Sequence, residues 1–189
     1  MASGAFKAPD RRTPCPRACY RFFPLNGPND WPGVVTVYKH RDGYPSGAAE
    51  AIEAALPHAW HLPRFEPDEF AAGFVRANKK SADDFARECE EQAEKETDPE
   101  QKIWLLERAR KYRTDPGYRS CCGGEIRLVP YEGLDAYKRF ATDIAYLYDI
   151  RCENGKIRVT AYSAREDEGE WTVGKFFEGS IKQLKRRKP

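Results

Sequence analysis

The sequence predicts an α+β fold: a largely antiparallel sheet of about five to six strands packed by helices, with an inserted charged helical hairpin. Segments rich in β-branched and aromatic residues lie on both sides of a central helical block. They do not alternate regularly with helices, as the strands of a parallel sheet do. An Asn-Gly pair between two of these segments indicates a tight hairpin. Alternating charges in the helical block indicate exposed helix surfaces.

The first two strands follow a polar N-terminal segment. Residues 1–17 contain Gly, Pro, Arg and Lys with little apolar periodicity, so they are predicted to form a flexible arm. Residues 19–23 and 34–40 are rich in β-branched and aromatic side chains and are predicted strands. Gly, Pro, Asn and Asp residues separate them. This turn composition favours an antiparallel pair.

Two helices are predicted after these strands. Apolar residues at helical spacing predict the first over 48–56, with Ser46 or Gly47 as its N-cap and Pro57 marking its end. The second is expected to begin at Pro67, because proline suits a first helical turn and acidic residues follow it. An apolar stripe on this second helix is most simply explained as part of the core.

The middle of the chain is highly charged. Residues 66–116 hold 14 acidic and 10 basic residues. Ser81 is a good helix start, and a second helical run covers 101–112. Residues 81–116 are therefore predicted to form a helical hairpin inserted in the fold. A solvated, self-packed hairpin is favoured over a partner-binding arm, because alternating charge is typical of exposed helices.

The C-terminal third returns to strands. Four are predicted, over residues 125–129, 145–151, 156–162 and 171–177. A short helix is expected around 133–142. Residues 18–182 are thus predicted to form a single domain that contains the hairpin insertion. The basic tail, 183–189, is expected to be solvated, with contact to a polyanion as the alternative.

Composition limits the class of protein. The chain has 189 residues and a formal net charge of +2. This small charge argues against a dedicated binder of duplex nucleic acid, which is usually strongly basic. No segment has the roughly 18 to 20 consecutive apolar residues needed to cross a bilayer, and the N-terminus lacks the pattern of a secretory signal. A soluble, cytoplasmic protein without membrane contact is expected.

The cysteines have irregular spacing. Cys15, Cys19, Cys121 and Cys122 match none of the common zinc patterns, so reduced thiols are favoured over a structural metal. We therefore predict no metal site and no cofactor. A metal bound by these four residues stays the alternative.

The segment from Tyr38 to Gly47 gathers the functional groups of a polar site. A strand end delivers His40, Asp42-Gly43 makes a turn, and a helix N-terminus follows. His40 is the candidate general base, with Asp42 to orient it. The candidate binding residues are Tyr38, Lys39, His40, Arg41, Asp42 and Tyr44.

The same segment has a plainer explanation. Asp-Gly is a common turn, Tyr-Pro fixes the chain direction, and a His at a strand end often only satisfies backbone groups. The segment has no second His, no glycine-rich phosphate loop and no paired carboxylates. Structural anchoring is therefore favoured over ligand or partner binding, and binding over catalysis.

The string Y-K-H-x-D-G-Y-P, Tyr38 to Pro45, resembles the signature of a family of uncharacterised small proteins from bacteria and their phages. Weaker likeness extends over parts of residues 33–80 and 122–182. The resemblance implies an α+β fold and brings no established activity. Arg41 stands where the family pattern has an aromatic residue, which changes any stacking role there. A phage origin favours a small inhibitor of a host defence protein, by analogy alone.

The sequence thus favours a non-enzymatic binding protein, a phage or mobile-element regulator or inhibitor of a host defence protein. Its contact surface is expected to be the charged hairpin or the Tyr38–Pro45 loop, and its partner a protein. The alternative is a nucleotide-binding or nucleic-acid-cleaving enzyme centred on His40 and Asp42. The oligomeric state is left open.

Overall fold

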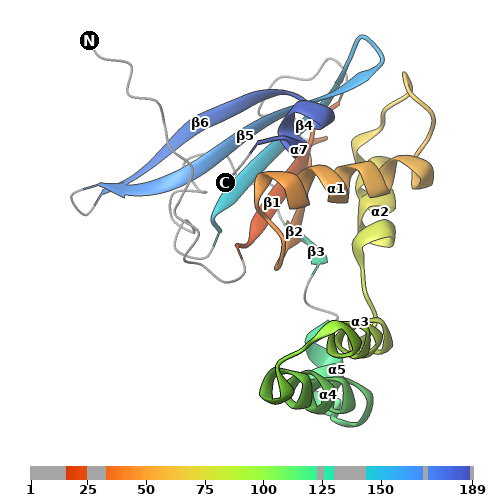
Figure 1. Cartoon of the computed structure of the whole chain (residues 1–189). Helices are drawn as coiled ribbons and strands as arrows, with labels where there is room; N and C mark the ends of the chain where they lie inside the picture. Colours follow the sequence, from red (N-terminus) through yellow and green to blue (C-terminus); the bar gives the residue numbers. More distant parts are fainter. Residues whose placement is uncertain (1–15, 25–32, 123–125, 130–143, 168–169, 188–189) are drawn as a thin grey trace. The chain divides into compact units, whose positions relative to one another are not determined.

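The computed structural model describes residues 16–24, 33–122, 126–129, 144–167 and 170–187. It confirms the α+β prediction: an open, mostly antiparallel six-stranded sheet is packed by helices (Figure 1). The chain divides into two compact units. We call residues 1–78 with 126–189 the sheet unit and residues 79–125 the helical unit.

The sheet has the strand order β3-β2-β1-β4-β5-β6. Its strands are β1 (Ala18–Phe22), β2 (Val35–Lys39), β3 (Ile126–Val129), β4 (Tyr146–Glu153), β5 (Lys156–Asp167) and β6 (Glu170–Ser180). The predicted antiparallel pairing of β1 with β2 is confirmed. At the Asn154-Gly155 turn, both residues have positive φ, +51° and +71°, as a tight two-residue hairpin requires. The central pair, β1 with β4, is parallel.

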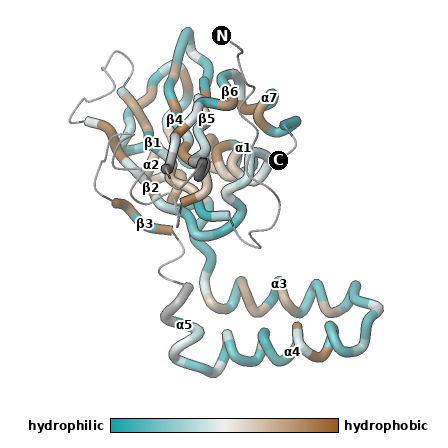
Figure 2. Tube along the Cα trace, turned by 90° about the vertical axis from the view of Figure 1, so that its left-hand side faces the viewer, coloured by the Kyte–Doolittle hydropathy of each residue, from teal (hydrophilic) through white to brown (hydrophobic). Residues whose placement is uncertain are grey.

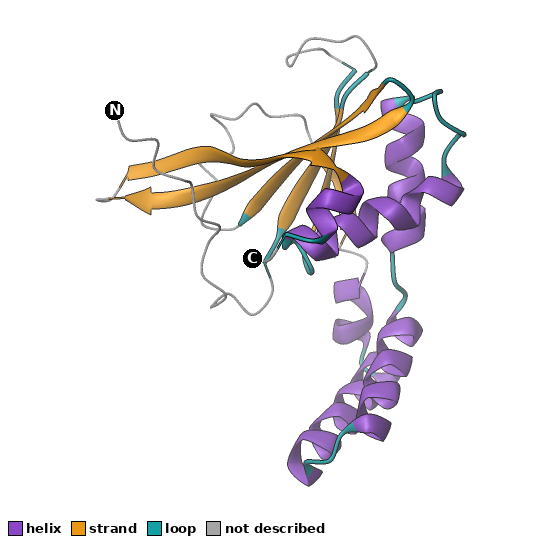
Figure 3. Ribbon diagram, turned by 45° about the horizontal axis from the view of Figure 1, so that its top comes forward, coloured by secondary structure: helices purple, strands orange, loops and turns teal. Residues whose placement is uncertain are grey.

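Helices α1 (Pro45–Ala55) and α2 (Pro67–Asn78) pack against each other beside the sheet (Figure 3). A short 3-10 turn, Leu56–His58, follows α1. The expected cap at Ser46 or Gly47 is wrong, because α1 begins at Pro45 with Tyr44 at the N-cap position. Gly47 has a steric role instead: a Cβ on it would lie 2.5 Å from the Asp42 carbonyl oxygen. Helix α7 (Ile181–Lys185) follows β6 and was not predicted.

Aromatic side chains form the core between this helix pair and one face of the sheet. Tyr20 and Phe22 on β1 are fully buried, as is Phe74 on α2. The ring centroids of Tyr20 and Phe74 lie 4.6 Å apart, and those of Phe22 and Phe74 lie 5.5 Å apart. Such tilted aromatic pairs add to the free energy gained by burial. The apolar stripe of α2 therefore belongs to the core, as predicted.

The helical unit contains α3 (Ala82–Lys95), α4 (Pro99–Thr114) and α5 (Pro116–Cys122). The predicted helix start at Ser81 is confirmed by a capping box with Asp84. Helix α4 begins two residues earlier than predicted, because Asp98 caps it. Helices α3 and α4 lie side by side (Figure 2), with Phe85 stacked on Tyr112 at 5.3 Å. Helix α5 was not predicted.

Three predictions lie outside the described residues. They are the short helix over 133–142, residues 1–15 of the arm predicted over 1–17, and the side chains of Cys15, Cys121 and Cys122. No helix within the described ranges combines the length and the apolar character needed to cross a membrane.

Replacing Ser81 by Ala is expected to remove the capping box of α3. Loss of an N-cap side chain costs about 1 kcal/mol, so amide hydrogen exchange in α3 should accelerate by about fivefold. Ser46→Ala is the matched control, because the Ser46 hydroxyl has no hydrogen-bond partner in the described part of the chain. Equal exchange rates in wild type and Ser81→Ala would contradict the role of the box.

Candidate functional site

The backbone of residues 40–44 is held from two sides. Asp42 has φ +55°, a left-handed conformation that is uncommon outside glycine. The Gly43 N–H donates to the Pro16 carbonyl at 2.9 Å, and the Tyr148 hydroxyl donates to the Gly43 carbonyl at 2.7 Å. A Cβ on Gly43 would lie 2.6 Å from the Pro16 oxygen, so only glycine fits. The loop is therefore fixed both to the chain entering β1 and to β4.

The side chains of the loop pair differently from the catalytic hypothesis. The Tyr38 hydroxyl lies 2.9 Å from His40 Nδ1. The Asp42 carboxylate lies 3.7 Å from Lys39 Nζ and accepts a long hydrogen bond, 3.5 Å, from the Tyr44 hydroxyl. Lys39 also donates to the Arg41 carbonyl at 2.6 Å. Among the described contacts, Asp42 is thus engaged with Lys39 and Tyr44, and no hydrogen bond joins it to His40.

One further residue joins this site from β3. Arg127 lies opposite Tyr38 in the strand register, and its guanidinium sits 5.4 Å from the centre of the Tyr38 ring. Sequence analysis missed Arg127 because the pairing of β2 with β3 is non-local. We call Tyr38–Asp42, Tyr44 and Arg127 the loop cluster. Asp42 and Arg127 are exposed, and the other members are half-buried.

The loop cluster is suited to recognition of an anionic surface. Lys39, Arg41 and Arg127 are cations, against the single carboxylate of Asp42. The Tyr38 and Tyr44 rings add apolar area with polar tips, a combination enriched at interfaces. A fixed backbone lowers the entropy that ordering the loop on binding would cost.

A second polar group was missed altogether: a buried ion pair across β1 and β4. Arg21 donates to Asp149 through Nε at 2.6 Å and Nη2 at 2.8 Å, and both residues are almost fully buried. Burial raises the pKa of the Asp149 carboxyl, while the charge of Arg21 and a hydrogen bond from Tyr162 act in the opposite direction. Two signals in the sequence could have indicated this pair: a single Arg in the apolar run 19–23 and a single Asp in the apolar run 146–150.

The ion pair has an aromatic neighbour on the same strands. Phe23 follows β1 and is fully buried, and its backbone N–H donates to the Ile150 carbonyl of β4. The guanidinium of Arg151 lies 3.9 Å from the centre of the Phe23 ring, and that of Arg21 lies 5.4 Å from it. Arg21, Asp149 and Phe23 are buried and Arg151 is half-buried, so we assign the Arg21–Asp149 pair a structural role.

Metal ligation finds no support in the described ranges. No group of three or more His, Cys, Asp or Glu side chains there is placed to hold an ion. Of the four cysteines in the metal alternative, Cys19 is described, and it is buried beside Leu147. The four-cysteine alternative itself involves side chains outside the described residues.

Comparisons with protein-family models, curated proteins and solved structures find no match to this chain. The resemblance at Tyr38–Pro45 therefore brings no residue roles with it. The function has to be argued from the contacts of the loop cluster itself.

Replacing Arg21 by Met is expected to leave the Asp149 carboxylate buried without its partner. Breaking a buried pair in this way costs about 3 to 5 kcal/mol in the free energy of unfolding, measured by urea denaturation. Arg21→Met with Asp149→Leu should recover most of this loss, since no buried charge remains. The control Arg158→Met removes exposed pairs to Glu153 and Glu178 and should cost less than about 1 kcal/mol. A double variant as unstable as Arg21→Met would contradict this explanation.

The penalty in Arg21→Met should also depend on pH. Without Arg21, desolvation acts on Asp149 with less opposition and raises its pKa further in the folded state. The folded state then binds the proton more tightly than the unfolded state, so stability falls as the pH rises from about 4 towards the raised pKa. The difference in unfolding free energy between wild type and variant should therefore be smaller at acid pH than at neutral pH. A constant difference would show that Asp149 is not the cause.

Proposed function

We propose that this chain is a non-enzymatic binding protein that presents the loop cluster to an acidic surface of a protein partner. The single observation that supports this most directly is the double anchoring of Gly43, by Pro16 and by Tyr148. A loop fixed in this way holds polar side chains at the surface in a defined arrangement. Such preorganisation favours recognition.

The contacts of His40 and Asp42 favour binding over catalysis. A general base gains from a carboxylate that orients its ring. Here the Asp42 carboxylate is engaged by Lys39 and Tyr44, and His40 Nδ1 lies against the Tyr38 hydroxyl. A loop that is anchored at Gly43, together with the three cationic side chains of the loop cluster, supports the proposal of a recognition surface.

The charge of the loop cluster and the resemblance at Tyr38–Pro45 support a proposal for the kind of partner. The excess of cations in the loop cluster favours an acidic protein surface, because complementary charge speeds association and selects partners. The resemblance to small phage and bacterial proteins favours a host protein, so we propose a phage or mobile-element regulator that inhibits a host defence protein. The alternative, nucleotide or nucleic-acid binding at His40, uses the same cations and is separated by the experiment below.

The test compares wild type with Arg41→Glu, Arg127→Glu and the matched control Arg76→Glu, an exposed arginine on α2. Proteins captured from a host lysate are identified, and the purified partner is titrated by calorimetry. Arg41→Glu and Arg127→Glu should each weaken binding at least tenfold, and Arg76→Glu less than twofold. Circular dichroism confirms that all variants fold.

Two results would contradict the proposal. Equal affinity of all variants for the partner would remove the loop cluster from the interface. Binding of nucleotides or oligonucleotides in fluorescence anisotropy, lost in His40→Ala and Asp42→Asn, would instead support the alternative centred on His40.

A further inference from the structure

Helix α4 exposes a turn that is apolar on every side. Leu105, Ala109 and Tyr112 are its buried residues, and Ala109 and Tyr112 belong to one hydrophobic cluster with residues of α3. Ile103, Trp104 and Leu106 remain 59%, 48% and 46% exposed. Figure 2 shows a brown stretch within the otherwise hydrophilic α4. Packing on α3 needs only one apolar face of α4. The contact between the two helices therefore does not explain why these three exposed side chains are apolar.

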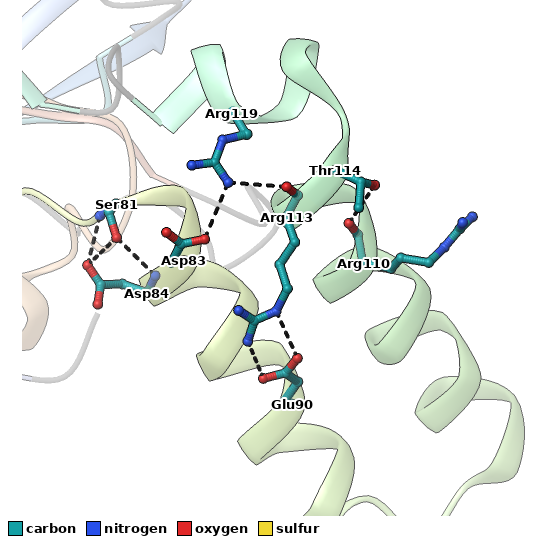
Figure 4. Close-up of polar contacts among 8 residues, drawn as sticks. All are labelled: Ser81, Asp83, Asp84, Glu90, Arg110, Arg113, Thr114 and Arg119. Atoms are coloured by element: carbon teal, nitrogen blue, oxygen red, sulfur yellow. Dashed lines mark hydrogen bonds and ion pairs between the residues drawn. The ribbon is translucent and has the colours of Figure 1, made fainter.

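In the described part of the helical unit, some charges are paired and others are not. Arg113 pairs with Glu90 of α3 at 2.7 Å, and Arg119 pairs with Asp83 at 3.3 Å (Figure 4). By contrast, the structure gives no ion pair, among the residues that it describes, to four exposed side chains flanking the apolar turn. They are Glu100, Lys102, Glu107 and Arg110. In Figure 4 the Arg110 side chain extends away from the Arg113–Glu90 pair.

Three of these four residues form a stripe together with Ile103, and the charge of the stripe changes sign along the helix; Lys102 lies outside it. Glu100, Ile103, Glu107 and Arg110 recur at spacings of three and four, which places them on one face. The acidic Glu100 lies towards the N-terminus of α4, and the basic Arg110 towards the C-terminus. An antiparallel copy of the same helix, aligned on the apolar turn, would bring Glu100 to within one residue of the level of Arg110. A parallel copy would place like charges together.

We propose that this face of α4 binds the same face of a second copy of the chain, antiparallel and across a two-fold axis. Such an interface is isologous, so each complementary contact occurs twice. Ile103 and Leu106 would be buried at its centre. Trp104, with the Arg108 guanidinium 5.0 Å from the centre of its ring, lies at the rim. Two acids and two bases in the flanking set favour self-recognition over a strongly charged foreign partner.

The proposed dimer does not depend on the loop cluster. Arg41→Glu and Arg127→Glu should leave the oligomeric state unchanged, and failure of either proposal does not affect the other. The area that one pair of 16-residue helices can bury is at the small end of the range for specific interfaces, which is roughly 1,200 Å² or more in total. We therefore expect reversible dissociation on dilution.

Sedimentation velocity of the full chain from about 1 to 200 µM tests the dimer. The wild type should change from a 21.7 kDa monomer to a dimer of twice that mass. Ile103→Glu should remain monomeric throughout, because it places a charge at the centre of the contact. The control Leu128→Glu, at an exposed apolar residue on β3, should dimerise like the wild type.

A charge exchange tests the antiparallel arrangement. Glu100→Arg should raise the dimer dissociation constant at least tenfold, and Glu100→Arg combined with Arg110→Glu should restore it to within about threefold of wild type. The proposal is overturned if the wild type stays monomeric or if Ile103→Glu still dimerises. Failure of the double variant to recover would overturn the antiparallel pairing. Circular dichroism excludes unfolding as the cause of any loss.

Discussion

The parallel pairing of β1 with β4 is the constraint on which the rest of the sheet unit depends. It joins two antiparallel halves, β3-β2-β1 and β4-β5-β6, into one sheet. Its two faces are specified by different chemistry. On one face Tyr20 stacks on Tyr148, with ring centroids 5.3 Å apart, and on the other Arg21 meets Asp149. A slip of one residue would move each partner to the wrong face, so these pairs define the register.

The geometry of the loop cluster depends on the pairing of β1 with β4. Tyr148 contributes its ring to the β1–β4 contact and its hydroxyl to the Gly43 carbonyl. The chain entering β1 supplies the Pro16 carbonyl that accepts from Gly43. A change in the β1–β4 register would therefore displace the loop as well as the core. Structural anchoring, which the sequence left as an alternative to binding, is present in the contacts of Gly43, while Asp42 and Arg127 stay exposed.

Features encoded within a few residues were predictable, and features that join distant segments were not. The Asn154-Gly155 turn and the Ser81 capping box depend on local chemistry, and both are present as expected. Arg21 and Asp149 lie 128 residues apart, with the helical unit between them, so nothing local links them. The cap at Ser46 or Gly47 is an exception, because this prediction was local and still wrong. Helix α1 begins at Pro45, which suits a first helical position, and Tyr44 is at the N-cap without a side-chain cap hydrogen bond.

The same distinction applies to the site. The motif from Tyr38 to Tyr44 was recognisable because its polar residues are contiguous. Which of these side chains contact one another could not be predicted. A His and an Asp two residues apart suggest a catalytic pair, whereas the left-handed backbone at Asp42 accompanies contacts to Lys39 and Tyr44. Arg127 enters through strand pairing alone.

The two proposed surfaces differ in charge, and this difference separates their roles. The loop cluster has an excess of cations, so two copies of it repel each other and it favours an acidic partner. The four charges that flank the apolar turn of α4 are two acids and two bases, and Glu100 at one end of the stripe complements Arg110 at the other in an antiparallel pair. Joining two chains through α4 would place two loop clusters in one particle. If one partner assembly offers two acidic sites within reach of both, the second contact forms at a high effective concentration, and affinity rises without any new contact in the loop.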